Sequence, residues 1–296
     1  GHSTATLPLP EELSAGWASD FMPNLEAPLE GYISQGPPSV FLAGRWAEAD
    51  MTYPEMLFAM FQKVMGMRGS GSEHDCASAV RVASVLFEHC HPPSMDGWLP
   101  LFFREVWLRI LVAETSELRS MALRLLALMA WYNPKLMLAC TEEQQCTKQL
   151  FEVWMHWGGH ARGLARKILL LGLVRLFQLC VDTVPVCFES GLPLMLQRLF
   201  QQSQEIVRWR RRGGREMNVE EGKDEDEEDD LADEERPSQL DAVDEIDILR
   251  MALLSVPVPV EKLNQWLGSS VELWLQELEA ECQRMRAERA AALAHA

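Results

Sequence analysis

Hydrophobic positions recur at helical spacing along most of the chain, and the most apolar stretch lies between Ala161 and Val207. Residues 161–177 carry only four charges: Arg162, Arg166, Lys167 and Arg175. These charges leave an apolar face around most of the helix. A helix of this kind has to be covered on more than one side. A second apolar helix is predicted over about 192–207, after a Pro-containing link. Together they predict a helical hairpin.

The same spacing predicts further helices, separated by Gly, Pro and capping residues. They are expected near 21–32, 52–67, 75–90, 94–111, 115–132, 145–157, 246–254, 261–267 and 271–292. Thr52 is a predicted N-cap, Pro54 suits a first helical turn, and Thr115-Ser116-Glu117-Leu118 is expected to open a later helix. Strand alternation is not evident. Hairpins recur every ~40 to 45 residues, the period of HEAT repeats. The sequence therefore predicts an all-α protein, an α-solenoid of HEAT-type hairpins with an acidic insertion.

The helical pattern also predicts where apolar side chains lie. The Met-rich stripe of the 52–67 helix is either a binding groove or core, and core is favoured. In the last helix, we expect four apolar side chains to dock on the preceding repeat: Leu273, Trp274, Leu275 and Leu278.

The charge is concentrated in one segment. The chain carries a net charge of −17, and residues 216–247 hold 17 acidic residues against Lys223 and Arg236. The remainder is nearly neutral, so acidity belongs to this segment alone. Such a charge density prevents burial of apolar area and predicts a disordered loop. It is either a solubilising loop or, because insertions in repeat arrays often emerge on the binding face, a cargo element.

The candidate site residues form two charged runs. Cargo steering is assigned to the centre of the acidic loop: Asp224, Glu225, Asp226, Glu227, Glu228, Asp229 and Asp230. A polyanion there would attract basic protein segments. A possible basic contact is assigned to the end of the preceding helix: Arg208, Arg210, Arg211 and Arg212. The alternative for these arginines is an exposed helix end, neutralised by the adjacent acids.

Candidate chemistry is sparse. Five residues invite a zinc interpretation: His74, Cys76, His89, Cys90 and His91. The last three are consecutive, so their side chains diverge around a helix and do not converge on one metal ion. Phosphate-binding loops, nucleophile motifs and paired catalytic carboxylates are not found, so neither an enzyme nor a cofactor is expected. The seven cysteines predict free buried thiols in a reducing compartment. We expect no membrane span and no direct nucleic-acid binding.

Four segments in order resemble one family. The stretches are TSELRSM at 115–121, WYNPKL at 131–136, FEVWM at 151–155, and GHAR at 159–162 with RKILLLGL at 166–173. They are similar to segments in the C-terminal part of nuclear import receptors of the importin-beta superfamily, in the branch of importin seven and importin eight. The acidic insertion and the helices after it also fall where that branch has them.

The resemblance implies a HEAT-repeat solenoid that carries cargo into the nucleus, shuttling between cytoplasm and nucleus. Implied partners are basic cargo such as ribosomal proteins and histones, with Ran GTPase, Phe-Gly nucleoporins and possibly importin beta for the full-length protein. The family's Phe-Gly-containing tail is not matched by the final residues, and its main Ran-contacting repeats lie in the N-terminal half. The rival hypothesis is a histone-chaperone-like or scaffold protein that shields basic clients.

The expected organisation has four parts. Residues 1–50 form leading short helices and loops, with Gly1-His2-Ser3 typical of an expression-tag remnant. Residues 51–215 form the HEAT-type repeats, 216–241 the disordered acidic loop, and 242–296 the C-terminal helices that cap the solenoid.

Overall fold

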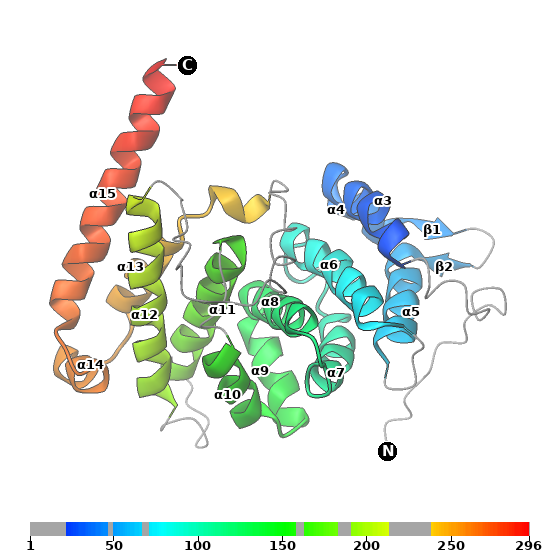
Figure 1. Ribbon diagram of the computed structural model, residues 1–296, viewed down its shortest axis with the longest axis horizontal. Coiled ribbons are helices and arrows are strands. Elements are labelled where there is room, and N and C mark those ends of the chain that lie inside the picture. Colours follow the sequence, from blue (N-terminus) through cyan, green and yellow to red (C-terminus); the bar gives the residue numbers. More distant parts are fainter. Residues whose placement is uncertain are drawn as a thin grey trace, which may run out of the picture. The chain divides into compact units, whose positions relative to one another are not determined.

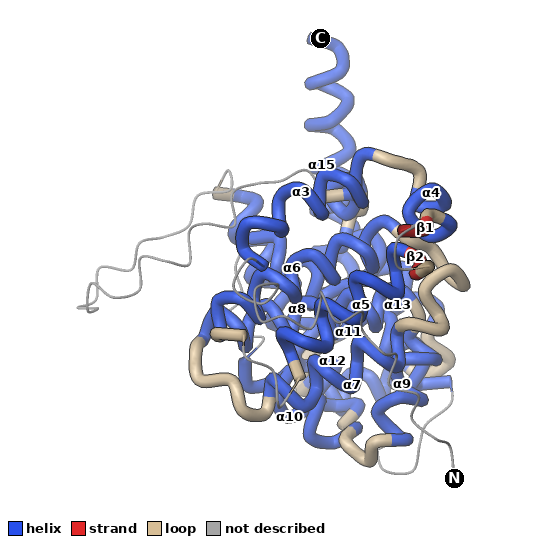
Figure 2. Tube along the Cα trace, turned by 90° about the vertical axis from the view of Figure 1, so that its right-hand side faces the viewer, coloured by secondary structure: helices blue, strands red, loops and turns tan. Residues whose placement is uncertain are grey.

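The computed structural model describes residues 22–46, 50–66, 71–157, 163–182, 191–212 and 238–295. Nearly all regular structure in these ranges is helical, which confirms the predicted all-α class (Figure 2). One feature was not predicted: strands β1 (Arg45–Trp46) and β2 (Met51–Thr52) pair antiparallel beside α4 and α5. Two-residue strands are too short to leave an alternation pattern in a sequence. The chain divides into two compact units, Gly1–Cys140 and Thr141–Ala296.

The first unit is built from helices in two layers (Figure 1). Its helices are α3 (Met22–Gln35), α4 (Pro38–Ala43), α5 (Tyr53–Met65), α6 (Glu73–His89), α7 (Leu99–Ile110) and α8 (Ser116–Tyr132). Helices α3, α6 and α8 pack side by side in one layer, while α5 and α7 pack together in the other. Because α5 also contacts α6 and α7 contacts α8, the unit consists of stacked hairpins, as in an α-solenoid.

Aromatic side chains fill the interior of the first unit. The Phe102 ring on α7 lies 5.1, 4.7 and 5.9 Å, between ring centroids, from Phe58, Phe61 and Phe87. Phe87 in turn packs edge-on against Tyr132 at the end of α8. Edge-to-face pairs of this kind stabilise a core beyond the apolar area that they bury. The Met-rich stripe of α5 is core, as predicted: Leu57, Met60, Phe61, Val64 and Met65 are buried.

Capping residues set the helix starts as predicted. The Thr52 hydroxyl accepts a hydrogen bond from the backbone N–H of Glu55, and the Glu55 carboxylate accepts one from the backbone N–H of Thr52. This capping box satisfies N–H groups that lack partners in the first turn. Thr115 caps α8 through the N–H of Leu118.

Two boundaries differ from the prediction. The helix expected from residue 94 begins at Leu99, because hydrogen-bonded turns occupy the preceding residues. No helix is predicted between residues 132 and 145, yet Pro134 opens α9 (Pro134–Glu143). The Asn133 side chain accepts a hydrogen bond from the N–H of Leu136, so one Asn-Pro pair ends α8 and caps the next helix.

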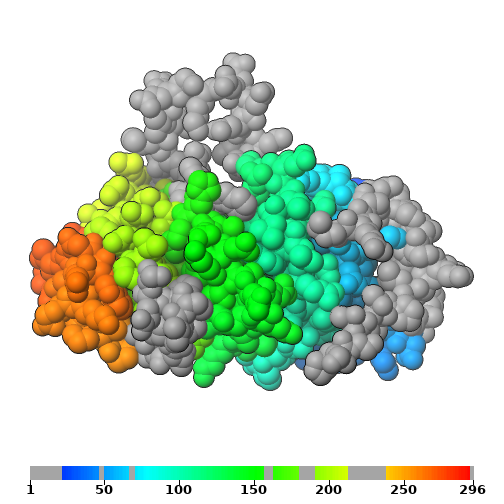
Figure 3. Space-filling view, turned by 90° about the horizontal axis from the view of Figure 1, so that it is seen from below, coloured from blue at the N-terminus to red at the C-terminus, as the bar shows by residue number. Residues whose placement is uncertain are grey.

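The second unit repeats the hairpin arrangement. Its helices are α10 (Thr147–Trp157), α11 (Gly163–Asp182), α12 (Leu192–Arg211), α13 (Glu245–Ser255), α14 (Val260–Leu267) and α15 (Val271–His295), with the short 3-10 helix η3 (Gln239–Ala242) before α13. The apolar helix α11 is covered by both α12 and α13, as its sequence requires. In the space-filling view the orange residues of α14 lie against the yellow-green residues of α12 (Figure 3).

The last helix docks through fewer residues than predicted. Trp274 and Leu278 are buried, and the indole N–H of Trp274 donates to the Ser203 hydroxyl at 3.1 Å. Leu273, however, is largely exposed, so the prediction that it docks is wrong. Leu273 lies about 100° around the helix from Trp274, outside the i, i+4 row that faces α12.

Candidate functional site

The predicted acidic site cannot be placed. Asp224 to Asp230 lie outside the described residues, as do residues 213–237 in general. The structure does describe the chain on either side of them. It ends α12 at Arg211 and resumes at Ser238, just before η3 and α13. The geometry of the site therefore comes from these two flanks.

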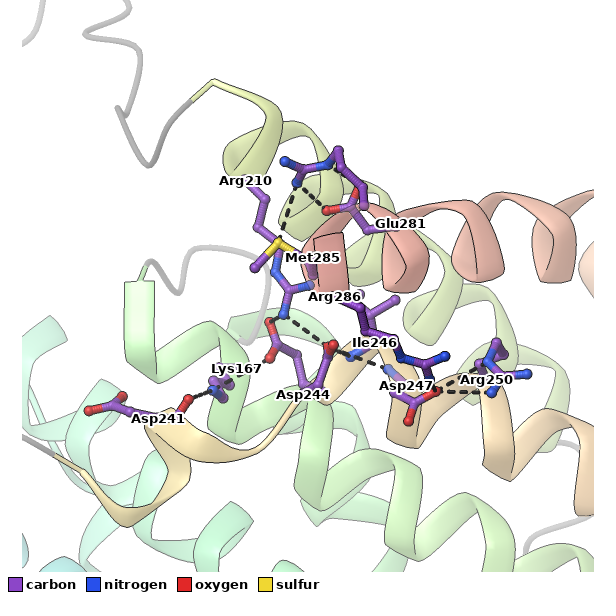
Figure 4. A network of polar contacts seen from close by, with 12 residues as sticks. Lys167, Arg210, Asp241, Asp244, Ile246, Asp247, Arg250, Glu281, Met285 and Arg286 are labelled. Carbon is purple, nitrogen blue, oxygen red and sulfur yellow. Dashed lines mark hydrogen bonds and ion pairs between the residues drawn. The ribbon is translucent and has the colours of Figure 1, made fainter. Parts of the chain in front are cut away.

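The flanks are joined by four charged side chains, here called the charge cluster: Lys167, Arg210, Asp244 and Glu245 (Figure 4). One guanidinium nitrogen of Arg210 lies 3.1 Å from Asp244 Oδ1 and 2.8 Å from Glu245 Oε1. Lys167 Nζ lies 3.5 Å from the other oxygen of Glu245. Thus α11, α12 and the start of α13 meet at one group of ions.

The charge cluster is buried. The side chains of Arg210 and Glu245 are only 10% and 5% exposed. Asp244 is also the N-cap of α13, where it accepts the backbone N–H of Ile246. A buried ion pair is weak evidence for added stability, but removing one partner leaves an uncompensated charge. Loss of Arg210 would therefore leave Asp244 without an opposite charge in this cluster.

A second set of ion pairs holds α15 beside the charge cluster (Figure 4). Arg250 on α13 lies 3.0 Å from Glu279, and Arg286 lies 3.4 Å from Asp247. The fully buried Glu281 carboxylate accepts from Arg284 and lies 3.7 Å from Arg211. Hydrogen bonds from Arg284 to Glu281 and Glu288 raise the pKa of its guanidinium, which stays charged.

The four predicted basic residues have different environments. Arg210 is engaged in the charge cluster, and Arg211 is 57% exposed while paired with Glu281. Arg208 and Arg212 are exposed, and neither has an ion pair with any residue that the structure describes. Arg210 is neutralised by Asp244 and Glu245, which belong to the acidic run 216–247.

The five residues that invited a zinc interpretation lie apart or point into the core. Cys76 and Cys90 are buried, and the His89 Nδ1 lies 3.0 Å from the Val85 carbonyl oxygen. Burial raises the pKa of Cys90 to about 11, so its thiol is protonated at neutral pH. Among the described residues, no group of three potential ligands converges on one point.

The sequence did not predict that the four residues of the charge cluster lie together. Lys167 and Arg210 were noted only as charges on separate helices, and their acidic partners lie 34 or more residues further along the chain. The one available signal was the Asp-Glu pair at 244–245, which begins a helix where two acids are common in any case.

Within the described ranges, no helix is long and apolar enough to cross a bilayer.

Comparisons with known proteins give a family. No protein-family model matches the sequence, and no solved structure matches it either. The chain is similar to the importin beta-like SAD2 homolog of Arabidopsis thaliana, with 24% identity over 205 residues, which cover 64% of this chain and 19% of that protein. It is also 31% identical to importin-8 of Homo sapiens over 137 residues, 42% of this chain and 13% of that protein.

A further relative gives the same result. Importin-8 of Danio rerio is 29% identical over 140 residues, which cover 44% of this chain and 14% of that protein. The chain thus matches less than a fifth of the length of each of these relatives. Together with the stacked helical hairpins, the matches make the chain similar to proteins of the importin-beta superfamily, importin-8 among them.

Proposed function

We propose that the chain is part of a nuclear transport receptor that binds basic protein cargo reversibly, without a catalytic step. The relatives named importins support a transport role. The uneven charge supports the class of cargo, because a net charge of about −15 lies in residues 216–247 of a chain that is otherwise nearly neutral. This concentration of negative charge is the observation that carries the proposal.

The charge cluster explains how the acidic residues would be presented. Arg210 holds the end of α12 to the start of α13, so residues 213–237 leave and re-enter the same part of the second unit. Asp224 to Asp230 are central in the sequence between these two flanks. A concentrated negative charge raises the association rate of basic partners by roughly tenfold or more at low salt.

The basic end of α12 has a smaller proposed role. Arg210 is committed to the charge cluster, which leaves Arg208 and Arg212 as the exposed candidates for a basic contact. The wider partners are proposals for the full-length protein: Ran GTPase, Phe-Gly nucleoporins and possibly importin beta, with shuttling between cytoplasm and nucleus. The domain limits at 51–215, 216–241 and 242–296 also remain predictions.

The test measures association of the chain with a Lys/Arg-rich peptide at two salt concentrations. One variant converts the seven acids from Asp224 to Asp230 to Asn or Gln. A matched control converts seven scattered exposed acids to amides and so has the same net charge: Asp50, Glu114, Glu143, Glu152, Glu261, Glu272 and Glu277. We expect the loop variant alone to lose most of its salt-sensitive association rate.

Equal losses in the two variants would overturn the assignment to Asp224–Asp230, because net charge alone would then explain the attraction. The rival scaffold or histone-chaperone function is separated by a second measurement. The full-length protein should bind Phe-Gly repeats if it is a transport receptor, whereas a chaperone that only shields basic clients does not need this affinity.

A further inference from the structure

The last helix of the second unit continues well past the end of its neighbour α12 (Figure 1). The two helices run side by side in the same direction, because Gln204 contacts Glu277 and, further along both helices, Arg211 contacts Glu281. Helix α12 ends at Arg211, whereas α15 continues from Glu281 to His295. At a rise of 1.5 Å per residue, α15 therefore extends about 20 Å beyond the end of α12.

The end of α12 carries three arginines on one face. Arg211 and Arg212 follow Arg208 by three and four residues, so the three side chains lie on the same side of the helix. Arg208 and Arg212 are exposed, and neither forms an ion pair with any residue that the structure describes. Arg211 stays 57% exposed although it pairs with Glu281. This helix end therefore offers guanidinium groups to the solvent.

Two arginines of α15 extend the same positive surface. Arg286 is 60% exposed although it lies 3.4 Å from Asp247, and Figure 4 shows it beside the end of α12. Arg289 is exposed and has no ion pair within the described part of the chain. It follows Met285 by one turn, and Met285 follows Glu281 by one turn, so Arg289 lies on the side of α15 that faces α12. We call five residues the arginine site: Arg208, Arg211, Arg212, Arg286 and Arg289.

The acidic side chains near the arginine site already have cationic partners. Glu281 and Glu288 on α15 both accept hydrogen bonds from Arg284. Glu205, one turn before the first arginine of the site, lies 3.6 Å from Arg166 on α11. Within the described ranges, the arginine site therefore keeps more positive charge than its neighbours neutralise.

The chemistry that fits this surface is a row of carboxylates. A guanidinium group donates two parallel hydrogen bonds to one carboxylate, and clusters of arginines recognise acidic motifs in this way. The helical rise from Arg208 to Arg211 and from Glu281 to Arg289 adds up to about 17 Å. An extended segment of about five or six residues spans this length.

We propose that the arginine site binds a short acidic segment of a partner protein. The inference rests on the basic contact proposed above for the end of α12, to which it adds α15 and a class of ligand. It is separate from cargo steering by Asp224–Asp230, since the two sites carry opposite charges. A nucleic acid fits less well, because the acidic run that follows Arg212 would repel its phosphate backbone along its whole length.

Binding of a labelled peptide of Glu and Asp residues to the full chain tests the proposal, by fluorescence anisotropy at two salt concentrations. One variant converts Arg208, Arg212 and Arg289 to Gln. A matched control with the same net charge converts three cations that are exposed elsewhere: Arg45, Lys135 and Lys148. We expect the affinity to fall about tenfold in the first variant and less than about twofold in the control.

A second variant replaces the same three arginines by lysine. It keeps the charge and loses the planar fork, so we expect a loss of affinity between those of the glutamine variant and the wild type. An affinity equal to that of the wild type would overturn recognition by the guanidinium groups.

Three further results would overturn the proposal. Equal losses in the glutamine variant and its control would show that net charge alone governs binding. Binding that is absent in the wild type and appears when Asp224–Asp230 are converted to amides would show that the acidic run of this chain occupies the site. Tighter binding of a single-stranded oligonucleotide of equal charge, with the same dependence on the three arginines, would show a nucleic-acid site.

Discussion

The two units hold their helices together in different ways. In the first, Phe102 lies among Phe58, Phe61 and Phe87 at the centre of an aromatic interior, and separate ion pairs such as Arg124–Glu88 link neighbouring helices. In the second, the helix ends on both sides of the acidic segment are joined by the charge cluster around Arg210. Burial of apolar groups is non-directional and tolerates repacking, whereas a buried ion pair requires each named partner.

The difference predicts where each unit is vulnerable. Apolar packing loses stability in proportion to the volume removed, whichever side chain is cut back. The charge cluster responds instead to the loss of one charge, even when the volume is kept. Variants that change side-chain volume and charge separately therefore test this difference between the units.

The largest effect is expected for Phe102→Ala. Removing the ring leaves a cavity among three aromatic neighbours and should lower the free energy of unfolding of the first unit by about 3–5 kcal/mol. Urea denaturation, with hydrogen exchange of α5 to α8, measures it. Val40→Ala, at a half-exposed side chain of the same unit, should change stability by less than about 0.5 kcal/mol. Similar losses in both would contradict an aromatic core centred on Phe102.

Arg210→Met keeps most of the side-chain volume and removes the charge. It removes the ion pair of Asp244 and leaves Glu245 with Lys167 as its partner, and should destabilise the second unit by about 3 kcal/mol. The matched control is Arg211→Met, because Arg211 is 57% exposed and Glu281 keeps Arg284 as a partner. That control should cost less than about 1 kcal/mol by chemical denaturation. If both variants cost the same, burial of the charge cluster has no energetic consequence.

Trp274→Phe tests a polar contact inside the apolar interface between α12 and α15. It removes the hydrogen bond to the Ser203 hydroxyl and part of the ring packed on Phe200, at a cost of about 1–2 kcal/mol. Thermal unfolding measures the loss. Trp266→Phe serves as the control, since that ring is less buried and packs beside Lys262. A greater loss in Trp266→Phe would mean that α14, rather than α15, closes the unit.

The smallest effect is a pH dependence in the first unit. Burial raises the pKa of Tyr132 from its ordinary value of 10 to about 12, because the folded state disfavours the charged phenolate. Its stabilisation is complete below pH 10 and is lost as the pH rises through 12. Relative to Tyr132→Phe, the wild type should lose about 1 kcal/mol over this range. If the two proteins lose the same free energy of unfolding as the pH rises from 10 to 12, the pH dependence does not come from Tyr132.

Local signals in the sequence predicted the helices well. Thr52 was predicted as a cap and Thr115 as the start of a helix, and both side chains accept a backbone hydrogen bond from three residues on, because a cap depends only on nearby residues. The α9 helix was missed because Asn133-Pro134 ends one helix and begins the next. A proline is compatible with the end of one helix and with the first turn of the next, so the sequence alone does not show that Pro134 does both.

Contacts between residues far apart in the sequence were not predicted. Nothing near Arg210 distinguishes it from Arg208, Arg211 and Arg212, yet only Arg210 joins the charge cluster. Its partners lie beyond the acidic run, so their proximity follows from helix packing rather than from spacing along the chain. For the same reason, the exposed residues Leu108, Leu111 and Val112 at the end of α7 look in the sequence like part of a buried helix face.

The closure made by Arg210 has a consequence for how this chain can vary. Bringing Arg210 and Asp244 together costs the unfolded chain entropy that grows only logarithmically with the number of residues between them, about 0.6 kcal/mol for each doubling. Residues added to or removed from the intervening run therefore change the folding free energy little, while each added carboxylate changes the attraction for a basic partner. The length and charge of this one run can drift among related chains almost independently of the stability of the helices that hold it.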